Sequence, residues 1–343
     1  MSDPFNAEAD DAFAISQLMF PTVGLCISVA AQHGLADVLD DGRLTATELA
    51  ERTRTDPGGL AKVLRVLIEE GIFREVEPGI FENTPLSRLL RRDHPRSQYA
   101  MACLVGSPWL WASWGKLSEA LTDGRPGFEL AHGTTLWEYL ARHPEDATIF
   151  NGAMTDFSEA LGDQVAAAYP EFASNGVIAD LGGGTGSYLN AILRAYPAVA
   201  RGVLVDLESV VEQARSRPDL AQLLESGRLE LYGGDFFEAV PADVDMYVVK
   251  QVMHSWNDDN VVRLLESCRK ASPRARLVAA EFVRDDKTSA FVKNFDLVMT
   301  VTMNGNVRSQ AEYADVFRRG GYELTRVVPT STAFSLVEAR PSR

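Results

Sequence analysis

The order of apolar and polar positions divides the 343-residue chain into a helical half and a half in which strands and helices alternate. From about residue 12 to residue 165, apolar side chains recur every three or four positions, which is typical of amphipathic helices. From Val177 onward, short apolar runs that end in an acid or a glycine alternate with helical stretches. This alternation predicts an α/β fold with a doubly wound, mostly parallel sheet.

The helical half begins with an unusually apolar helix, expected between residues 12 and 40, followed by a helix, a turn, a second helix and a hairpin. The two helices are expected near residues 44–50 and 60–70, and the hairpin at residues 72–82. Together they form a winged-helix pattern, which in other proteins can enter the DNA major groove. Because the second helix and the wing carry several glutamates, a packing or dimerisation module is favoured over DNA binding.

Five strands are predicted in the C-terminal half, each ending near a polar or small residue, and two further segments are predicted to form a closing antiparallel hairpin. The five strands are expected at residues 177–180, 202–206, 228–232, 245–250 and 276–281, and the hairpin at residues 321–328 and 332–339. Ligands of open α/β sheets bind beyond the carboxyl ends of the strands. Candidate binding residues should therefore follow these segments directly.

The first strand runs into a glycine-rich turn, Asp180-Leu-Gly182-Gly183-Gly184-Thr-Gly186, with a helix beginning after it. A dinucleotide fingerprint needs a third small residue, Gly or Ala, where this chain has serine or leucine, and no triphosphate-binding loop motif occurs. A carboxylate at Asp180 would repel phosphate. The turn therefore predicts a ligand that carries an amine rather than a pyrophosphate.

The ends of the later strands supply further candidates. Asp206 can accept hydrogen bonds from both ribose hydroxyls, or it can cap the next helix. Asp235 can accept from an adenine amino group while Phe236 covers the ring. His254 is the one histidine expected at a strand end facing the ligand, where a neutral imidazole can take a proton from a hydroxyl. No second histidine or cysteine lies nearby, so no metal site is predicted.

Composition narrows the class of partner and compartment. The net charge of −15 disfavours nucleic acid and anionic membranes as partners. We find neither a secretory signal nor a membrane-spanning stretch, and Cys26, Cys103 and Cys268 are expected to be reduced thiols. A cytoplasmic location is therefore expected.

These residues carry a resemblance that covers nearly the whole chain. The chain resembles S-adenosylmethionine-dependent small-molecule O-methyltransferases of the caffeic-acid and hydroxyindole type, in particular the bacterial natural-product branch. The resemblance lies in the winged helix and, after it, in the glycine turn, Asp206, Gly234-Asp235-Phe236-Phe237 and Lys250-x-x-x-His254-x-Trp256-x-Asp258. The resemblance implies a Rossmann-like class I methyltransferase domain with a seven-stranded, mostly parallel sheet, preceded by a mainly helical winged-helix dimerisation domain. It implies a dimerisation domain at residues 1–95, a helical region lining the substrate pocket at 96–165, and a cofactor-binding catalytic domain at 166–343.

The resemblance also assigns roles. S-adenosylmethionine, which leaves as S-adenosylhomocysteine, would be held by Asp180, Gly182, Gly184, Asp206, Gly234, Asp235, Phe236, Lys250 and Trp256. His254 matches the general base and Glu281 a glutamate beside it. Phe150, Asn151 and Met154 match a helix that borders cofactor and substrate. Apart from the resemblance, the apolar side chains of Met253, Met299 and Met303 suggest a flat substrate pocket, and Asn294 and Asp296 could bind a substrate hydroxyl or cap a helix. The chain departs from the family pattern at Val307, where the family often has a second glutamate.

The function implied is methylation of a phenolic hydroxyl of an aromatic natural product by a homodimer formed through the N-terminal domain. Some relatives keep the cofactor site but catalyse decarboxylation, hydroxylation or ring closure, so these reactions stay open. A cofactor-binding winged-helix regulator is a remote alternative.

Overall fold

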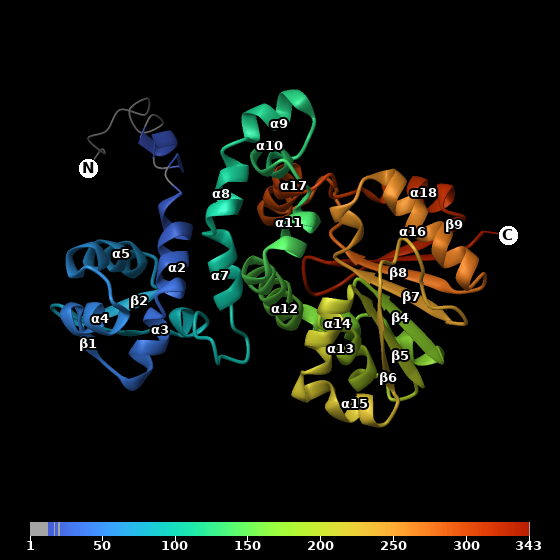
Figure 1. The fold of residues 1–343 in the computed structure, drawn as a ribbon, viewed down its shortest axis with the longest axis horizontal. Coiled ribbons are helices and arrows are strands. Elements are labelled where there is room, and N and C mark those ends of the chain that lie inside the picture. The colour runs from blue at the N-terminus through green and yellow to red at the C-terminus, as the bar shows by residue number, and fades with distance from the viewer. Residues whose placement is uncertain (1–12, 17, 20, 343) are drawn as a thin grey trace, which may run out of the picture. The chain divides into compact units, whose positions relative to one another are not determined.

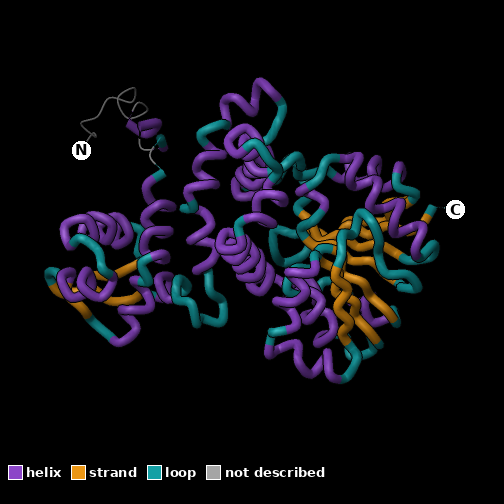
Figure 2. The backbone as a smooth tube through the Cα atoms, viewed as in Figure 1, coloured by secondary structure: helices purple, strands orange, loops and turns teal. Residues whose placement is uncertain are grey.

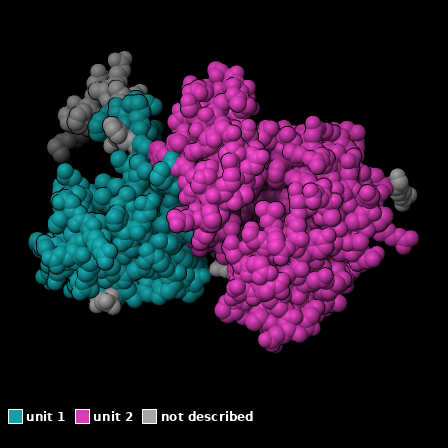
Figure 3. Space-filling view, viewed as in Figure 1, with its two compact units in different colours: residues 1–108 teal, residues 109–343 magenta. Residues whose placement is uncertain are grey.

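The computed structural model describes residues 13–16, 18–19 and 21–342 of the chain. The chain forms two compact units, residues 1–108 and residues 109–343 (Figure 3). The division falls after the boundary expected at residue 95, because helix α7 (Tyr99–Val105) packs against α2 (Thr22–Gln32) within the first unit. The helical region expected at residues 96–165 is therefore divided between the two units.

The first unit is mainly helical and contains a three-stranded antiparallel sheet in the order β1-β3-β2. Its other elements are α3 (Leu35–Val38), η1 (Leu39–Asp41), β1 (Leu44–Thr45), α4 (Ala46–Thr53), α5 (Pro57–Glu69), β2 (Phe73–Glu77), β3 (Ile80–Asn83) and α6 (Pro85–Arg88). Helices α4 and α5 followed by the β2–β3 hairpin form the predicted winged-helix pattern (Figure 1).

Local sequence signals fix the ends of the two central helices of this unit. The Thr45 side chain accepts the Glu48 N–H and the Glu48 carboxylate accepts the Thr45 N–H, a reciprocal cap that begins α4. The Asp56 carboxylate accepts the Gly59 N–H, so α5 begins at Pro57. The two glycines expected in a turn before this helix therefore belong to its first turn, and the expected start at residue 60 is wrong.

The second unit begins with helices and continues into the large sheet. The helices before the sheet are α8 (Pro108–Trp114), α9 (Leu117–Asp123), α10 (Gly127–His132), α11 (Leu136–Arg142), the long α12 (Pro144–Ala167) and η2 (Pro170–Ser174). Aromatic rings of α8, α10 and α11 pack together, with Trp109 and Tyr139 both against Phe128. Trp109 and Phe128 are buried, so these rings form an aromatic core among the three helices.

The sheet has seven strands in the order β6-β5-β4-β7-β8-β10-β9. Strands β4 (Val177–Leu181), β5 (Arg201–Asp206), β6 (Leu229–Gly233), β7 (Met246–Lys250) and β8 (Arg276–Glu281) are parallel, and β9 (Tyr322–Pro329) and β10 (Ser335–Pro341) form the antiparallel edge. The helices between them are α13 (Ser187–Ala195), α14 (Glu208–Arg215), η3 (Pro218–Leu220), α15 (Ala221–Glu225), η4 (Met253–Ser255), α16 (Asp258–Ala271), α17 (Ala290–Thr302) and α18 (Gln310–Arg319). The predicted fold class is confirmed.

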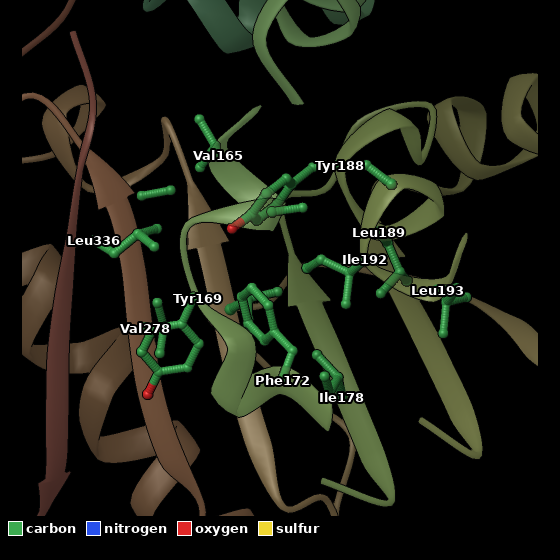
Figure 4. Packing of buried hydrophobic residues seen from close by; sticks show 14 of the residues in the cluster. Val165, Tyr169, Phe172, Ile178, Tyr188, Leu189, Ile192, Leu193, Val278 and Leu336 are labelled. Carbon is green, nitrogen blue, oxygen red and sulfur yellow. The ribbon is translucent and has the colours of Figure 1, made fainter. Parts of the chain in front are cut away.

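Successive side chains of each strand point to opposite faces, so helices cover both sides of the sheet (Figure 2). On one face, Ile178 belongs to a buried cluster that also contains Val165, Phe172 and residues of α13, such as Ile192 (Figure 4). On the other face, the neighbouring strand positions pack against α16 and α18. The two cores leave the carboxyl ends of the parallel strands to carry the polar residues described next. No helix in the described part of the chain is long and apolar enough to cross a membrane.

Candidate active site at the strand ends

The glycine turn after β4 takes the conformation that its sequence predicts. Gly182 and Gly184 have φ angles of +67° and +60°, which favour glycine over residues with a side chain. The N–H groups of Gly182 and Gly183 both donate to the Val205 carbonyl oxygen, at 2.8 and 3.2 Å. A Cβ atom at Gly182 would lie 2.7 Å from Val252 Cγ2, whereas one at Gly184 would meet nothing within 4 Å. The turn therefore packs tightly on one side and is open beside Gly184.

Asp206 ties this turn to the end of β5. Its Oδ2 accepts the Gly184 N–H and its Oδ1 accepts the Leu207 N–H, both at 2.8 Å. Burial raises the pKa of Asp206, against the lowering effect of these two backbone hydrogen bonds. Each carboxylate oxygen keeps a second lone pair with which it can accept a ligand hydroxyl.

Asp180 lies beneath the turn. Its side chain is 0 % exposed, and neither of its oxygens has a hydrogen-bond partner among the described residues. A Cβ atom at Gly183 would be 2.6 Å from Asp180 Oδ2, so the carboxylate lies directly under the backbone of the turn. Burial raises the pKa of Asp180 to about 7, and the Lys250 charge opposes this rise. In this conformation the carboxylate presents no surface to a ligand, which differs from the direct contact expected from the sequence.

An aromatic cluster lies near the ends of β6 and β7. Phe237 packs edge-on against Trp256, with ring centroids 4.7 Å apart, and also contacts Phe236. Trp137 of α11 stacks on Trp256, with centroids 5.9 Å apart and an interplanar angle of 22°. The sequence pattern did not indicate Trp137, because nothing in the periodicity of α11 distinguishes a site residue from a core residue.

Two polar residues lie next to this cluster. The Gly234 N–H donates to the Asp206 carbonyl oxygen at 3.0 Å, which brings the ends of β5 and β6 together. Asp235 Oδ1 accepts the Phe237 N–H at 2.8 Å. The structure thus gathers Asp206, Gly234, Asp235 and the aromatic rings at one edge of the sheet.

Lys250 ends β7 as a buried cation. Its Nζ donates to Ser158 Oγ of α12 at 2.9 Å and to Gln251 Oε1 at 2.8 Å. Burial lowers the pKa of Lys250 to about 8, while the nearby Asp180 and Glu281 carboxylates oppose that effect. The next residue, Gln251, has a φ angle of +57°, which is unusual for a residue with a side chain and turns the backbone sharply.

That turn leads into η4, where His254 meets Glu281 from the end of β8. His254 Nδ1 lies 2.6 Å from Glu281 Oε2, and both side chains are buried, at 6 % and 0 % exposure. Glu281 Oε1 accepts the N–H groups of Val252 and Met253 at 2.9 and 2.8 Å. Because a carboxylate only accepts, His254 Nδ1 must carry the hydrogen and Nε2 must be the basic nitrogen. No hydrogen bond to Nε2 is found among the described residues.

The expected substrate residues occupy different depths. Met253, Met299 and Phe150 are buried, Asn151 and Met303 are half-buried, and Met154 and Asn294 are exposed. Helix α17 reaches the dyad through Phe295, whose ring packs edge-on against the His254 imidazole with centroids 4.9 Å apart. Asp296 Oδ1 accepts the Val307 N–H at 2.7 Å. Asp296 thus lies inside α17, whose N-cap is Ser289, and its Oδ1 anchors the segment after that helix; its role as a substrate ligand stays a prediction.

Comparison with known proteins gives a consistent family. Residues 114–323 match an O-methyltransferase domain, and residues 11–93 match an O-methyltransferase dimerisation domain. The chain is similar to phenazine O-methyltransferase of Lysobacter antibioticus (37% identity, covering 91% of both chains) and to 8-amino-8-demethylriboflavin N,N-dimethyltransferase of Streptomyces davaonensis (34% identity, covering 93% of this chain and 92% of the relative). Among solved structures, it is similar to a methyltransferase of calicheamicin biosynthesis in an S-adenosylhomocysteine-bound form (TM-score 0.82, 31% identity, covering 98% of this chain and 100% of that one).

Proposed function

The chain belongs to this O-methyltransferase family, whose members use S-adenosylmethionine, and we propose that it methylates a phenolic hydroxyl of an aromatic natural product with His254 as the general base. The observation that carries the proposal is the buried pair of His254 and Glu281, which leaves Nε2 as the basic nitrogen. A phenol has a pKa near ~10, so a base increases the fraction of phenolate at neutral pH. An acceptor that is already nucleophilic has no need for such a pair.

The residues at the strand ends fit the cofactor. Gly182 and Gly184 would approach its methionine part, and Asp206 would accept from its ribose hydroxyls with the lone pairs that its backbone contacts leave free. Gly234, Asp235, Phe236 and Trp256 would surround the adenine, and the backbone around Lys250, whose Nζ donates to Ser158, would line the same cofactor. Asp180, a buried carboxylate for which the described residues offer no hydrogen-bond partner, would stabilise the positive charge of the ligand from beneath the turn.

When bound, the cofactor supplies an electrophilic methyl group. His254 Nε2 takes the hydroxyl proton of the acceptor, and the Glu281 carboxylate stabilises the imidazolium that results, at 2.6 Å from Nδ1. The Phe295 ring packs edge-on against the imidazole, which is buried. Aligning the reacting atoms can contribute up to ~7 to 11 kcal/mol in favourable cases, so the walls of the pocket matter as much as the base.

The acceptor is inferred to be flat and apolar. Met253, Met299 and Met303, with Phe150, supply soft apolar surface that adapts to aromatic rings. Met154 and Asn294 are exposed, and together with the half-buried Asn151 they would contact the outer part of the acceptor.

A second candidate is N-methylation of an aromatic amine. It is supported by the 34% identity to an N,N-dimethyltransferase. An amine offers its lone pair without prior loss of a proton, so such a reaction would depend little on His254.

The test is incubation with S-adenosylmethionine and a panel of hydroxylated and amino-substituted aromatic acceptors, followed by mass spectrometry. Gain of one methylene on a hydroxyl, with loss of most of the rate in His254→Ala, supports the proposal. The exposed His33→Ala is the matched control. Gain on an amine with His254→Ala unaffected supports the second candidate. Loss of carbon dioxide, gain of oxygen, or ring closure without methyl gain would refute both.

The dimerisation domain at residues 11–93 supports a homodimer. Light scattering on the purified full chain should give twice the monomer mass; a monomer at working concentration contradicts this part of the proposal.

A further inference from the structure

The segment where this chain departs from its family contains a buried arginine directly after Val307. We propose that Arg308 is a positioning residue: it holds the short loop that carries His254, at residues 253–256, in the geometry that proton transfer requires. The inference rests on the proposed function insofar as His254 is the base, but the contacts of Arg308 are independent of the acceptor.

Arg308 binds that loop on both sides of the histidine. Its side chain is 0 % exposed. Its Nη1 donates to the Met253 carbonyl oxygen at 2.7 Å, and its Nη2 donates to the Trp256 carbonyl oxygen at 2.8 Å. Its Nε and Nη2 also donate to Asp258 Oδ1, at 2.9 and 2.8 Å. One guanidinium thus contacts the residue before His254, the residue two positions after it, and the first turn of α16.

The loop is fixed from two directions as a result. Glu281 accepts the Met253 N–H and the His254 Nδ1–H, and Arg308 donates to the Met253 carbonyl oxygen from the other side of that residue. Only a planar guanidinium offers several donors in a fixed fork, so a lysine could not reach both carbonyl groups at once. Val307 cannot hydrogen-bond the imidazole, so the side-chain hydrogen bonds found for Met253 and His254 among the described residues come from Glu281 and Arg308.

Arg308 is itself held firmly. Asp296 of α17 accepts the Val307 N–H at 2.7 Å, while Arg284 donates from its backbone N–H to the Arg308 carbonyl oxygen at 2.9 Å. Gly305 passes so close to the loop that a Cβ atom there would overlap the His254 carbonyl oxygen. The segment therefore links the helix that carries Phe295 to the loop that carries the base.

The matched control is Arg319, which pairs with Asp259 at 2.5 Å and approaches the same Asp258 at 3.8 Å. It is partly exposed. Arg319→Met therefore removes a guanidinium beside the same carboxylate, whereas Arg308→Met removes one that also holds the two loop carbonyls.

The experiment compares Arg308→Met, Arg308→Lys and Arg319→Met in the full-length chain by two readouts. The first is kcat and KM for a hydroxyl acceptor. A displacement of the base by about 1 Å can cost on the order of 10²-fold in rate. Arg308→Met should therefore lower kcat by about that factor, while the KM values for the acceptor and for S-adenosylmethionine change far less. Arg308→Lys should recover part of the rate, and Arg319→Met should keep nearly all of it.

The second readout needs no activity: the ¹⁵N spectrum of the histidine rings in the ligand-free protein reports the Nδ1–H of His254 bonded to Glu281. Arg308→Met should shift or broaden that signal, and Arg319→Met should leave it in place. If Arg308→Met fails to fold, Arg308→Lys decides. An unchanged signal and kcat in the Arg308 variants, or equal losses in Arg319→Met, overturn the proposal. If the wild type methylates no acceptor, the proposed function fails, and the spectrum still tests the positioning.

Discussion

Replacing Glu281 by glutamine should invert the proton placement on His254 while preserving the fold. Glu281 Oε1 accepts two backbone N–H groups at 2.9 and 2.8 Å, and Oε2 accepts His254 Nδ1–H at 2.6 Å. In Glu281→Gln, the amide oxygen keeps the two backbone contacts and the NH₂ group faces His254. In the opposite amide orientation, the glutamine NH₂ group would face two buried backbone N–H groups, which would then have no acceptor, at a cost of about 1 to 3 kcal/mol for each.

An NH₂ group facing Nδ1 must donate, so the imidazole hydrogen moves to Nε2, and the nitrogen that should take the acceptor proton becomes a donor. General base catalysis contributes about 10²- to 10⁴-fold, which corresponds to about 3 to 5 kcal/mol of barrier. We therefore expect kcat to fall by a factor in that range, with the melting temperature little changed.

The assay measures S-adenosylhomocysteine formation with two phenols of similar shape, one of them acidic enough to be ionised at neutral pH. The loss in Glu281→Gln should be large for the ordinary phenol and small for the ionised one, since the latter needs no base. Equal losses for both acceptors, or no loss for either, would refute the assignment of Glu281 and His254 as a base pair.

Three other changes test the cofactor side and the catalytic loop. The pKa of Asp180 is about 7 in the folded protein, against an ordinary value of 3.8, so the carboxyl group lowers the stability of the fold as the pH rises from about 4 to 7. Asp180→Asn, which cannot ionise, should therefore be more stable than the wild type between pH 5 and 8, by at most ~4 kcal/mol in thermal unfolding. Asp206→Asn should weaken S-adenosylhomocysteine binding by about 10- to 100-fold in calorimetry, because hydrogen bonds to a charged group contribute about 1.5 to 3 kcal/mol; unchanged affinity would remove Asp206 from the site. Gly305→Ala should displace the His254 carbonyl, which lowers kcat and reduces the free energy of unfolding by about 1 to 3 kcal/mol. In the control Gly24→Ala, where the added Cβ has no atom within 4 Å, both kcat and the free energy of unfolding should stay unchanged.

Much of the fold could be predicted from the sequence because its determinants are local. The strands are short apolar runs that end in polar residues, and glycines occur where the backbone turns with positive φ, as at Gly182 and Gly184. The bounds expected for the five parallel strands therefore lie within one residue of those observed, whereas the last strand, expected at residues 332–339, is observed at Ser335–Pro341. The start of α5 was misplaced because Asp56 and Pro57 act together as a helix start, which outweighs the two glycines that follow.

The site was less predictable, because its geometry depends on contacts between distant segments. The stacking of Trp137 on Trp256 joins α11 to the loop after η4, and no spacing in the sequence indicates it. The sequence does not indicate that Asp180 lies beneath Gly183, because there the acid is predicted to meet the same ligand as the glycines. The order of residues in the sequence indicated which residues gather at the strand ends, but not which of their side chains are exposed to a ligand.

Val307 and Arg308 show why a lost motif residue need not mean a lost site. Glu281 satisfies the His254 Nδ1–H and two backbone N–H groups by itself, so the hydrogen on the imidazole is placed without a second carboxylate. What a single carboxylate cannot do is hold the far side of the loop, and the Arg308 guanidinium does this through the Met253 and Trp256 carbonyl oxygens. The loss of the arginine would leave the Trp256 carbonyl oxygen without this donor, and would leave the Met253 carbonyl oxygen with the Trp256 N–H alone, at 3.3 Å. Positions 307 and 308 therefore differ in role, and it is Arg308 whose hydrogen bonds hold the loop at residues 253–256.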